Sequence, residues 1–133
     1  MSDPASRFMV AVVDDDRRVL ASLAALLESA DYVVRPYDSA AAMLESGSLA
    51  EIDCLISDVG MPVMDGFELL QRVRAARPEL PVILISGRSD ALARAAVGGG
   101  AGYRLFRKPF EGRELLAAVR GALQQHRIPD SPS

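Results

Sequence analysis

FMVAVVDDD, residues 8–16, is an apolar run that ends in three acidic residues. A second apolar run, IDCLIS at residues 52–57, is followed directly by Asp58. If both runs are parallel strands of one sheet, their acids meet at its carboxyl edge, where open α/β sheets bind ligands. Clustered carboxylates repel one another unless a cation neutralises them. The two runs therefore predict an α/β sheet with a site for a hard divalent cation, with Mg²⁺ as the first candidate.

The rest of the chain alternates short apolar strands with helical patterns. Apolar residues recur at helical spacing in the helical segments, and the run at 81–85 is nearly all apolar, as in a strand covered on both faces. This alternation predicts a parallel sheet with helices on both faces. Strands are predicted at residues 8–13, 32–35, 52–57, 81–85 and 103–107, and helices at 17–29, 39–47, 67–77, 89–97 and 115–125.

Length and composition exclude several classes of protein. The 133 residues fit one domain, predicted over 7–126, with a flexible N-terminus at 1–6 and a disordered tail or linker at 127–133. The net charge of -3 comes without a basic stripe, so we expect no direct binding to nucleic acid. No apolar run reaches the length of a membrane span, and we expect a cytoplasmic protein. The single cysteine, Cys54, lies in an apolar run and is interpreted as a buried hydrophobe.

Five polar residues follow predicted strands and could carry chemistry, although each also has a structural interpretation. Acids at such positions cap helices or form turns, and a serine after a strand is usually a turn residue. The lysine is more informative, because it is the single lysine among 15 basic residues, and a compact ammonium suits contact with a phosphoryl oxygen. The five residues are Asp14, Asp15, Asp58, Ser86 and Lys108.

The chain resembles the receiver domain of two-component response regulators over residues 7–126. The resemblance implies a flavodoxin-like, doubly wound, five-stranded parallel sheet with strand order 2-1-3-4-5 and five helices. It rests on matching stretches spread along the whole chain: Val12-Val13-Asp14-Asp15, Ile56-Ser57-Asp58, Met61-Pro62 with Met64-Asp65-Gly66, Ile85-Ser86-Gly87 and Lys108-Pro109-Phe110.

The resemblance also implies a role for each residue of the site. Asp58 would accept a phosphoryl group from a histidine, and Ser86 and Lys108 would contact that group. Asp14, Asp15, Asp58 and the backbone carbonyl of Gly60 would hold Mg²⁺. The Lys108-Pro109 peptide bond is expected to be cis.

A receiver implies particular partners. The phosphoryl donor would be a sensor histidine kinase or a phosphotransfer protein, and the chain would catalyse only its own phosphorylation and dephosphorylation. Phosphorylation would bias the face formed by the fourth helix, the fifth strand and the fifth helix, and a homodimer through this face is expected.

The sequence departs from the family at three places. Leu105 stands where the family often has the Tyr or Phe that acts with Ser86 as a switch, and Tyr103 lies two residues earlier on the same strand face. Gly98-Gly99-Gly100 predicts a loose fourth helix, and Gly60 replaces a side chain that could touch an attacking water.

Two other functions fit parts of the pattern. A degenerate receiver would bind a partner without being phosphorylated, which the substitution at Leu105 allows. A phosphatase of the haloacid dehalogenase type also uses Asp, Ser and Lys in this order, but no acidic pair follows Lys108 at a strand end and no room remains for a cap domain. Nucleotide binding is disfavoured because no Gly-rich loop follows the first strand.

Overall fold

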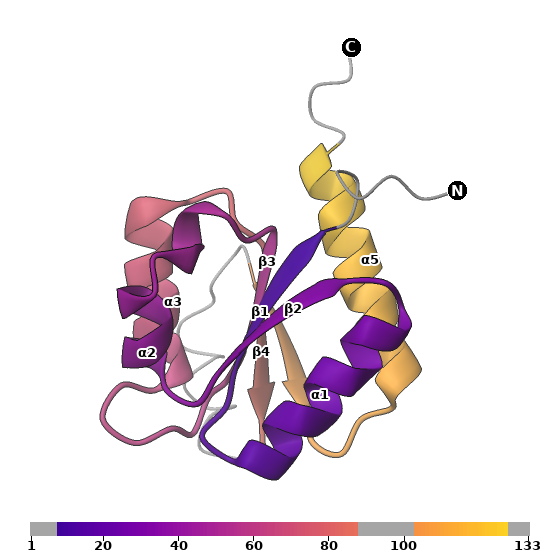
Figure 1. Cartoon of the computed structure of the whole chain (residues 1–133), viewed down its shortest axis with the longest axis horizontal. Helices are drawn as coiled ribbons and strands as arrows, with labels where there is room; N and C mark the ends of the chain where they lie inside the picture. The colour runs from indigo at the N-terminus through magenta and orange to yellow at the C-terminus, as the bar shows by residue number, and fades with distance from the viewer. Residues whose placement is uncertain (1–7, 88–102, 128–133) are drawn as a thin grey trace.

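The computed structural model contains one five-stranded parallel sheet between two layers of helices (Figure 1). It describes residues 8–87 and 103–127. The strand order β2-β1-β3-β4-β5 confirms the predicted order 2-1-3-4-5. The strands are β1 (Met9–Val13), β2 (Val33–Tyr37), β3 (Cys54–Asp58), β4 (Val82–Ser86) and β5 (Tyr103–Arg107).

The helices divide between the two faces of the sheet. In Figure 1, α1 (Arg17–Ser29) and α5 (Gly112–Arg127) cover one face, and α2 (Ala40–Glu45) and α3 (Gly66–Ala76) cover the other. A short 3₁₀ turn, η2 (Ser48–Ala50), follows α2 and was not predicted. The predicted helix at 89–97 lies outside the described residues.

The core is split by the sheet into two apolar clusters. Along β1, Val10 and Val12 pack in the cluster under α1 and α5, whereas Ala11 and Val13 pack in the cluster under α2 and α3. This alternation follows from the two-residue period of a strand. All five residues of β4 are buried, as predicted for a strand that is covered on both faces. Cys54 is also fully buried, which confirms its interpretation as a core residue.

Each of the three helices α1, α2 and α3 begins at a side-chain cap. The capping oxygen accepts a hydrogen bond from a backbone N–H of the first turn, which satisfies a donor that has no partner within the helix. The caps are Asp16 to the N–H of Arg18 at 2.9 Å, Ser39 to that of Ala42 at 3.0 Å, and Asp65 to that of Glu68 at 2.9 Å. The helix starts predicted at residues 17, 39 and 67 thus lie within one residue of the observed starts.

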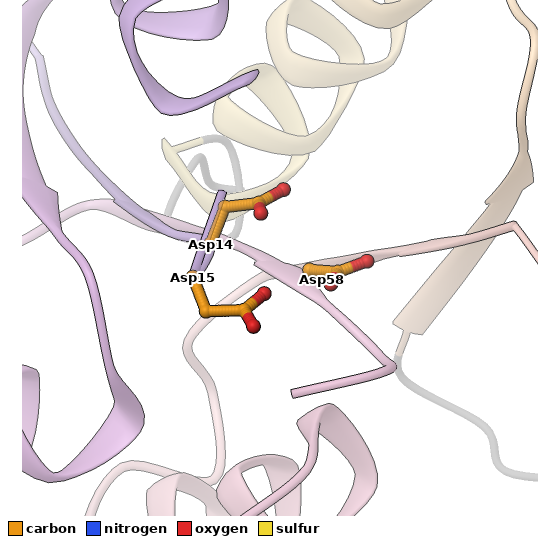
Figure 2. A group of neighbouring side chains, drawn as sticks. All are labelled: Asp14, Asp15 and Asp58. Carbon is orange, nitrogen blue, oxygen red and sulfur yellow. The ribbon is translucent and has the colours of Figure 1, made fainter. Parts of the chain in front are cut away.

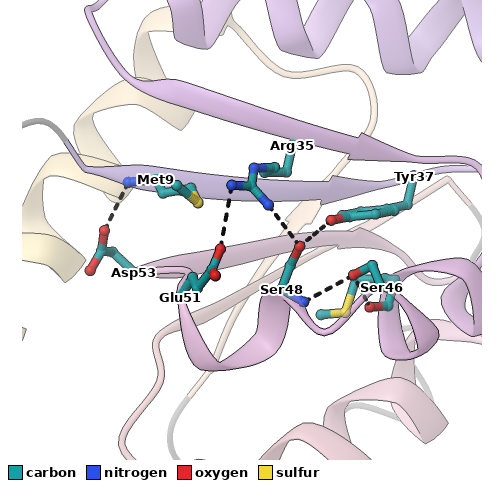
Figure 3. A network of polar contacts seen from close by, with 8 residues as sticks. Met9, Arg35, Tyr37, Ser46, Ser48, Glu51 and Asp53 are labelled. Atoms are coloured by element: carbon teal, nitrogen blue, oxygen red, sulfur yellow. Dashed lines mark hydrogen bonds and ion pairs between the residues drawn. The ribbon is translucent and has the colours of Figure 1, made fainter.

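A polar network fixes η2 against the edge strand β2 (Figure 3). The Arg35 guanidinium donates to Ser48 Oγ at 3.0 Å and pairs with Glu51 at 3.4 Å. The Tyr37 hydroxyl also hydrogen-bonds Ser48, whose side chain is buried. Because a buried hydroxyl needs partners, these contacts satisfy Ser48 and anchor the turn that precedes β3.

The same turn is also held by Arg77, the residue that follows α3. The Arg77 Nη1 atom donates to the carbonyl oxygens of Leu49, at 2.9 Å, and Ile52, at 2.6 Å. Arg77 also pairs with Glu79 at 2.9 Å. Arg35 and Arg77 thus fix the segment that leads into the amino end of β3. The carboxyl end of the same strand carries Asp58.

Candidate functional site

Three aspartates converge at the carboxyl edge of the sheet. β1 and β3 are neighbours with Val13 opposite Ser57, so Asp14 and Asp58 leave the two strands at equivalent positions. One carboxylate oxygen from each of Asp14, Asp15 and Asp58 lies within 4.8 Å of the others. Figure 2 shows the three side chains around one shared space. The convergence predicted from the two apolar runs is therefore present in the fold.

Asp14 is the most deeply buried of the three acids. It is 1% exposed, its Oδ1 accepts the N–H of Asp16 at 2.9 Å, and its buried Oδ2 has no hydrogen-bond partner among the described residues. The pKa of Asp14 is raised from 3.8 to about 6, chiefly by burial; the Asp16 N–H and Lys108 act to lower it, and the charges of Asp58 and Asp15 act to raise it. A buried oxygen without a partner is costly. This donor set of hard oxygens therefore fits a cation such as Mg²⁺.

Asp58 combines partial burial with an adjacent positive charge. Its side chain is 11% exposed, and its Oδ1 lies 3.8 Å from the Lys108 ammonium. Burial raises the pKa of Asp58, and the charge of Asp15 adds to this effect. Lys108 and the backbone N–H groups of Gly60 and Val59 act in the opposite direction. The Asp58 carboxylate is thus placed where an incoming anionic group would meet both a cation and backbone donors.

Lys108 and Ser86 lie beside the acids at the ends of β5 and β4. The Lys108 N–H donates to the Ser86 carbonyl oxygen at 2.8 Å, which extends the β4–β5 pairing by one bond, and Ser86 is 2% exposed. The Lys108-Pro109 peptide bond is cis, as expected. Phe106 and Phe110 bracket this turn in an edge-to-face contact with ring centres 5.6 Å apart. These contacts fix the backbone from which the lysine reaches Asp58.

Two glycines in and after the β3–α3 loop differ in what surrounds them. Gly60 is exposed, and a Cβ added there would meet no atom within 4 Å. A Cβ added at Gly66 would lie 2.5 Å from the Asp58 carbonyl oxygen and 2.9 Å from the Val59 Cα. The start of α3 can therefore lie against the strand end that bears Asp58 only because residue 66 has no side chain. From the sequence, Gly66 was noted only within a matching stretch, and this role was missed.

The comparisons with known proteins agree with this geometry. A family model described as the response regulator receiver domain matches residues 10–120. The chain belongs to the response regulator receiver family. Receiver domains of response regulators are the phosphoacceptors of two-component systems, and this is the function of the chain. The matches give no support to the phosphatase or to the degenerate receiver.

Two curated relatives show how much of a longer protein the receiver covers. The chain is 38% identical over 125 residues to the response regulator protein TodT of Pseudomonas putida, an alignment that covers 93% of the chain and 54% of TodT. It is 42% identical over 115 residues to the transcriptional regulatory protein FixJ of Azorhizobium caulinodans, covering 86% of the chain and 54% of FixJ. The chain therefore spans about half the length of these relatives.

Solved receiver structures share the fold. A response regulator receiver domain from Clostridium thermocellum superposes with a TM-score of 0.83 at 25% identity, covering 91% of this chain and 98% of that one. The signal receiver domain of an HD domain-containing protein from Pseudomonas fluorescens gives 0.80 at 34% identity, covering 90% and 97%. Within the described parts of the receiver, no helix combines the length and the hydropathy that a membrane crossing needs.

The departure at Leu105 leaves a different aromatic arrangement in this receiver. Leu105 and Tyr103 both pack against the cluster on the α2 and α3 face, as strand alternation predicts. The Tyr103 ring makes a T-shaped contact with the ring of Phe67, at the start of α3, with ring centres 6.3 Å apart. Aromatic contact between β5 and α3 is therefore made two residues before Leu105. The switch role of Ser86 and Leu105 stays a prediction.

Proposed function

We propose that Asp58 is the phosphoacceptor of this receiver. Receivers bind Mg²⁺ at an acidic site, and here Asp14, Asp15, Asp58 and the carbonyl of Gly60 would hold the ion. The observation that supports this assignment is the ion pair between Asp58 and Lys108, beside a buried Asp14 oxygen that has no protein partner. Of the three acids, Asp58 alone combines an ion pair with Lys108 and partial exposure to solvent.

The chemistry is the transfer of a phosphoryl group between two anionic partners. An Asp58 carboxylate oxygen attacks the phosphorus of a phosphohistidine, a P–O bond forms, and the P–N bond breaks with its electron pair returning to the imidazole. The Lys108 ammonium, 3.8 Å from Asp58, offsets the negative charge that accumulates there. When bound, Mg²⁺ would offset further charge and help to orient the Asp58 carboxylate toward the phosphorus. Positioning and charge supply most of the catalysis in such a transfer.

The partners follow from the family. Receiver domains interact with histidine kinases or phosphotransfer proteins, and a phosphohistidine of such a protein would be the donor here. Phosphorylation replaces the single negative charge of the Asp58 carboxylate by close to two negative charges on the phosphoryl group. The Ser86 hydroxyl would donate to a phosphoryl oxygen, and this change would bias the face that includes β5 and α5 toward a second state, including a homodimer.

Labelling with a small phosphodonor tests the assignment of Asp58. With Mg²⁺ and acetyl phosphate, intact-mass analysis should show one added phosphoryl group, and hydroxylamine should release it because it is an acyl phosphate. Asp58→Asn should show no labelling, and the exposed Asp38→Asn variant should label like the parent. Chelation of Mg²⁺ should abolish labelling. Equal labelling of Asp58→Asn and the parent would contradict the proposal.

A further inference from the structure

One residue of the β3–α3 loop combines full exposure with a strained backbone. Val63 is 103% exposed, and among the described residues it is the one large hydrophobic side chain in this condition. Its φ is 69°, in the left-handed region. A β-branched residue rarely adopts this conformation, because its Cβ crowds the backbone.

Hydrogen bonds show how the loop holds this conformation. The Met64 N–H donates to the Pro62 carbonyl oxygen at 2.7 Å, which closes a three-residue turn centred on Val63. With a positive φ at its centre, this turn matches the rarer and more strained kind of γ-turn. The loop is fixed on one side by buried Met61 and on the other by Gly66, whose N–H donates to the Val59 carbonyl oxygen at 3.0 Å.

The identity of the side chain makes the position unusual. Gly, Asn or Asp would adopt this φ with less strain, and a polar residue would also be better solvated. Val63 is therefore unfavourable for the isolated protein in two independent ways. Backbone strain that the surrounding structure maintains often marks a functional site.

The location of Val63 connects it with the phosphoacceptor. The loop leaves β3 at the edge toward which β4 and β5 point in Figure 1. Val63 lies five positions after Asp58, so the two Cα atoms lie within about 18 Å of each other. Asp58 is the last residue of its strand, and its side chain is only 11% exposed. A protein that delivers a phosphoryl group to Asp58 must therefore approach across this edge.

We infer that Val63 is a contact residue for the phosphohistidine-bearing protein, and that it packs into an apolar patch on that partner. The inference rests on the proposed function of Asp58. The chemistry of the loop favours an apolar partner surface, because Pro62 and Val63 are exposed and Met64 is half-buried. The one charged residue of the loop, Asp65, points its carboxylate at the first turn of α3 as a cap.

The test separates delivery by a protein from the chemistry at Asp58. The donor is the autophosphorylated kinase domain that labels the parent fastest in a panel of purified histidine kinases, and acetyl phosphate is the small donor. Val63→Gly should lower the second-order rate of transfer from the kinase about tenfold, equivalent to about 1.4 kcal/mol. Its labelling by acetyl phosphate should equal that of the parent. Val63→Leu, which keeps an apolar side chain, should stay within about twofold of the parent in both assays, a difference smaller than 1.4 kcal/mol.

Asp31→Gly is the matched control. Asp31 also has a positive φ, of 73°, but it lies beyond the last turn of α1. This variant should leave both rates unchanged. Equal kinase transfer to Val63→Gly and the parent would overturn the inference, as would parallel losses in both assays or a parent that no kinase labels. A parent that acetyl phosphate also fails to label would instead refute the role of Asp58.

Discussion

Replacing Asp14 by Asn should stabilise the metal-free protein at neutral pH. Burial raises the pKa of this carboxyl from 3.8 to about 6. Between these two values the folded protein binds more protons than the unfolded chain, so its free energy of unfolding falls as pH rises. A shift of about two pKa units at about 1.36 kcal/mol each gives a cost of about 3 kcal/mol at pH 7.5. Asparagine carries no charge and can still accept the Asp16 N–H.

Urea unfolding followed by circular dichroism measures this effect, since the chain has no tryptophan to report by fluorescence. Without Mg²⁺, Asp14→Asn should be more stable than the parent by about 1–3 kcal/mol at pH 7.5, and the gap should shrink by about 2 kcal/mol at pH 4.5. Saturating Mg²⁺ should stabilise the parent, by about 2.7 kcal/mol at a hundredfold excess over its dissociation constant, and should affect the variant little. The affinity of the parent for Mg²⁺ should rise with pH up to about 6 as Asp14 loses its proton.

Asp16→Asn provides the control for this comparison. Asp16 is an exposed neighbour that caps α1, and asparagine caps helices as well as aspartate does. Its stability should therefore lie within about 0.5 kcal/mol of the parent. A metal-free Asp14→Asn variant that is less stable than the parent at pH 7.5, or a gap that does not change with pH, would refute the reasoning about Asp14.

Two further predictions concern residues that position the site. Gly66→Ala should cost about 1–3 kcal/mol and slow labelling by acetyl phosphate, because its Cβ would lie 2.5 Å from the Asp58 carbonyl oxygen; Gly121→Ala, where a Cβ meets no atom within 4 Å, should not destabilise. Arg77→Met should cost about 2 kcal/mol in urea unfolding by removing the hydrogen bonds to the η2 segment, whereas Arg113→Met, which removes an exposed ion pair, should cost less than about 0.5 kcal/mol. Equal behaviour of either variant and its control would count against that role.

Local signals located all five strands but not every strand boundary. Strand β2 was predicted at 32–35, yet it runs from Val33 to Tyr37, past Pro36. The Val33 N–H donates to the Phe8 carbonyl oxygen, so alternate N–H groups face β1 and position 36 faces outward. Pro36 lies on the edge strand, where the missing N–H removes no bond within the sheet. The boundary therefore depends on pairing and not on local propensity.

The 3₁₀ turn η2 could not be predicted for a related reason. Its preceding residue Gly47 has a φ of 81°, which signals a turn but not which turn. The conformation is fixed by side chains that are distant in sequence, with Arg35 reaching it from β2 and Arg77 from the end of α3. Neither contact can be predicted from spacing in the sequence, because both depend on how the segments pack together in the folded protein.

In the site, the sequence named Asp14 and Asp15 as metal ligands but could not show how differently the two are buried. Asp14, Asp15 and Asp16 are identical as letters, yet the first is buried, the second is exposed in the acid cluster, and the third caps α1. The cost of burying Asp14 and the strain at Val63 likewise emerge only in three dimensions. Both unfavourable features lie at the edge that bears Asp58, where stability commonly yields to function. Substitution at either position should therefore spare or raise stability and weaken a step of phosphorylation, metal binding for Asp14 and delivery of the phosphoryl group for Val63.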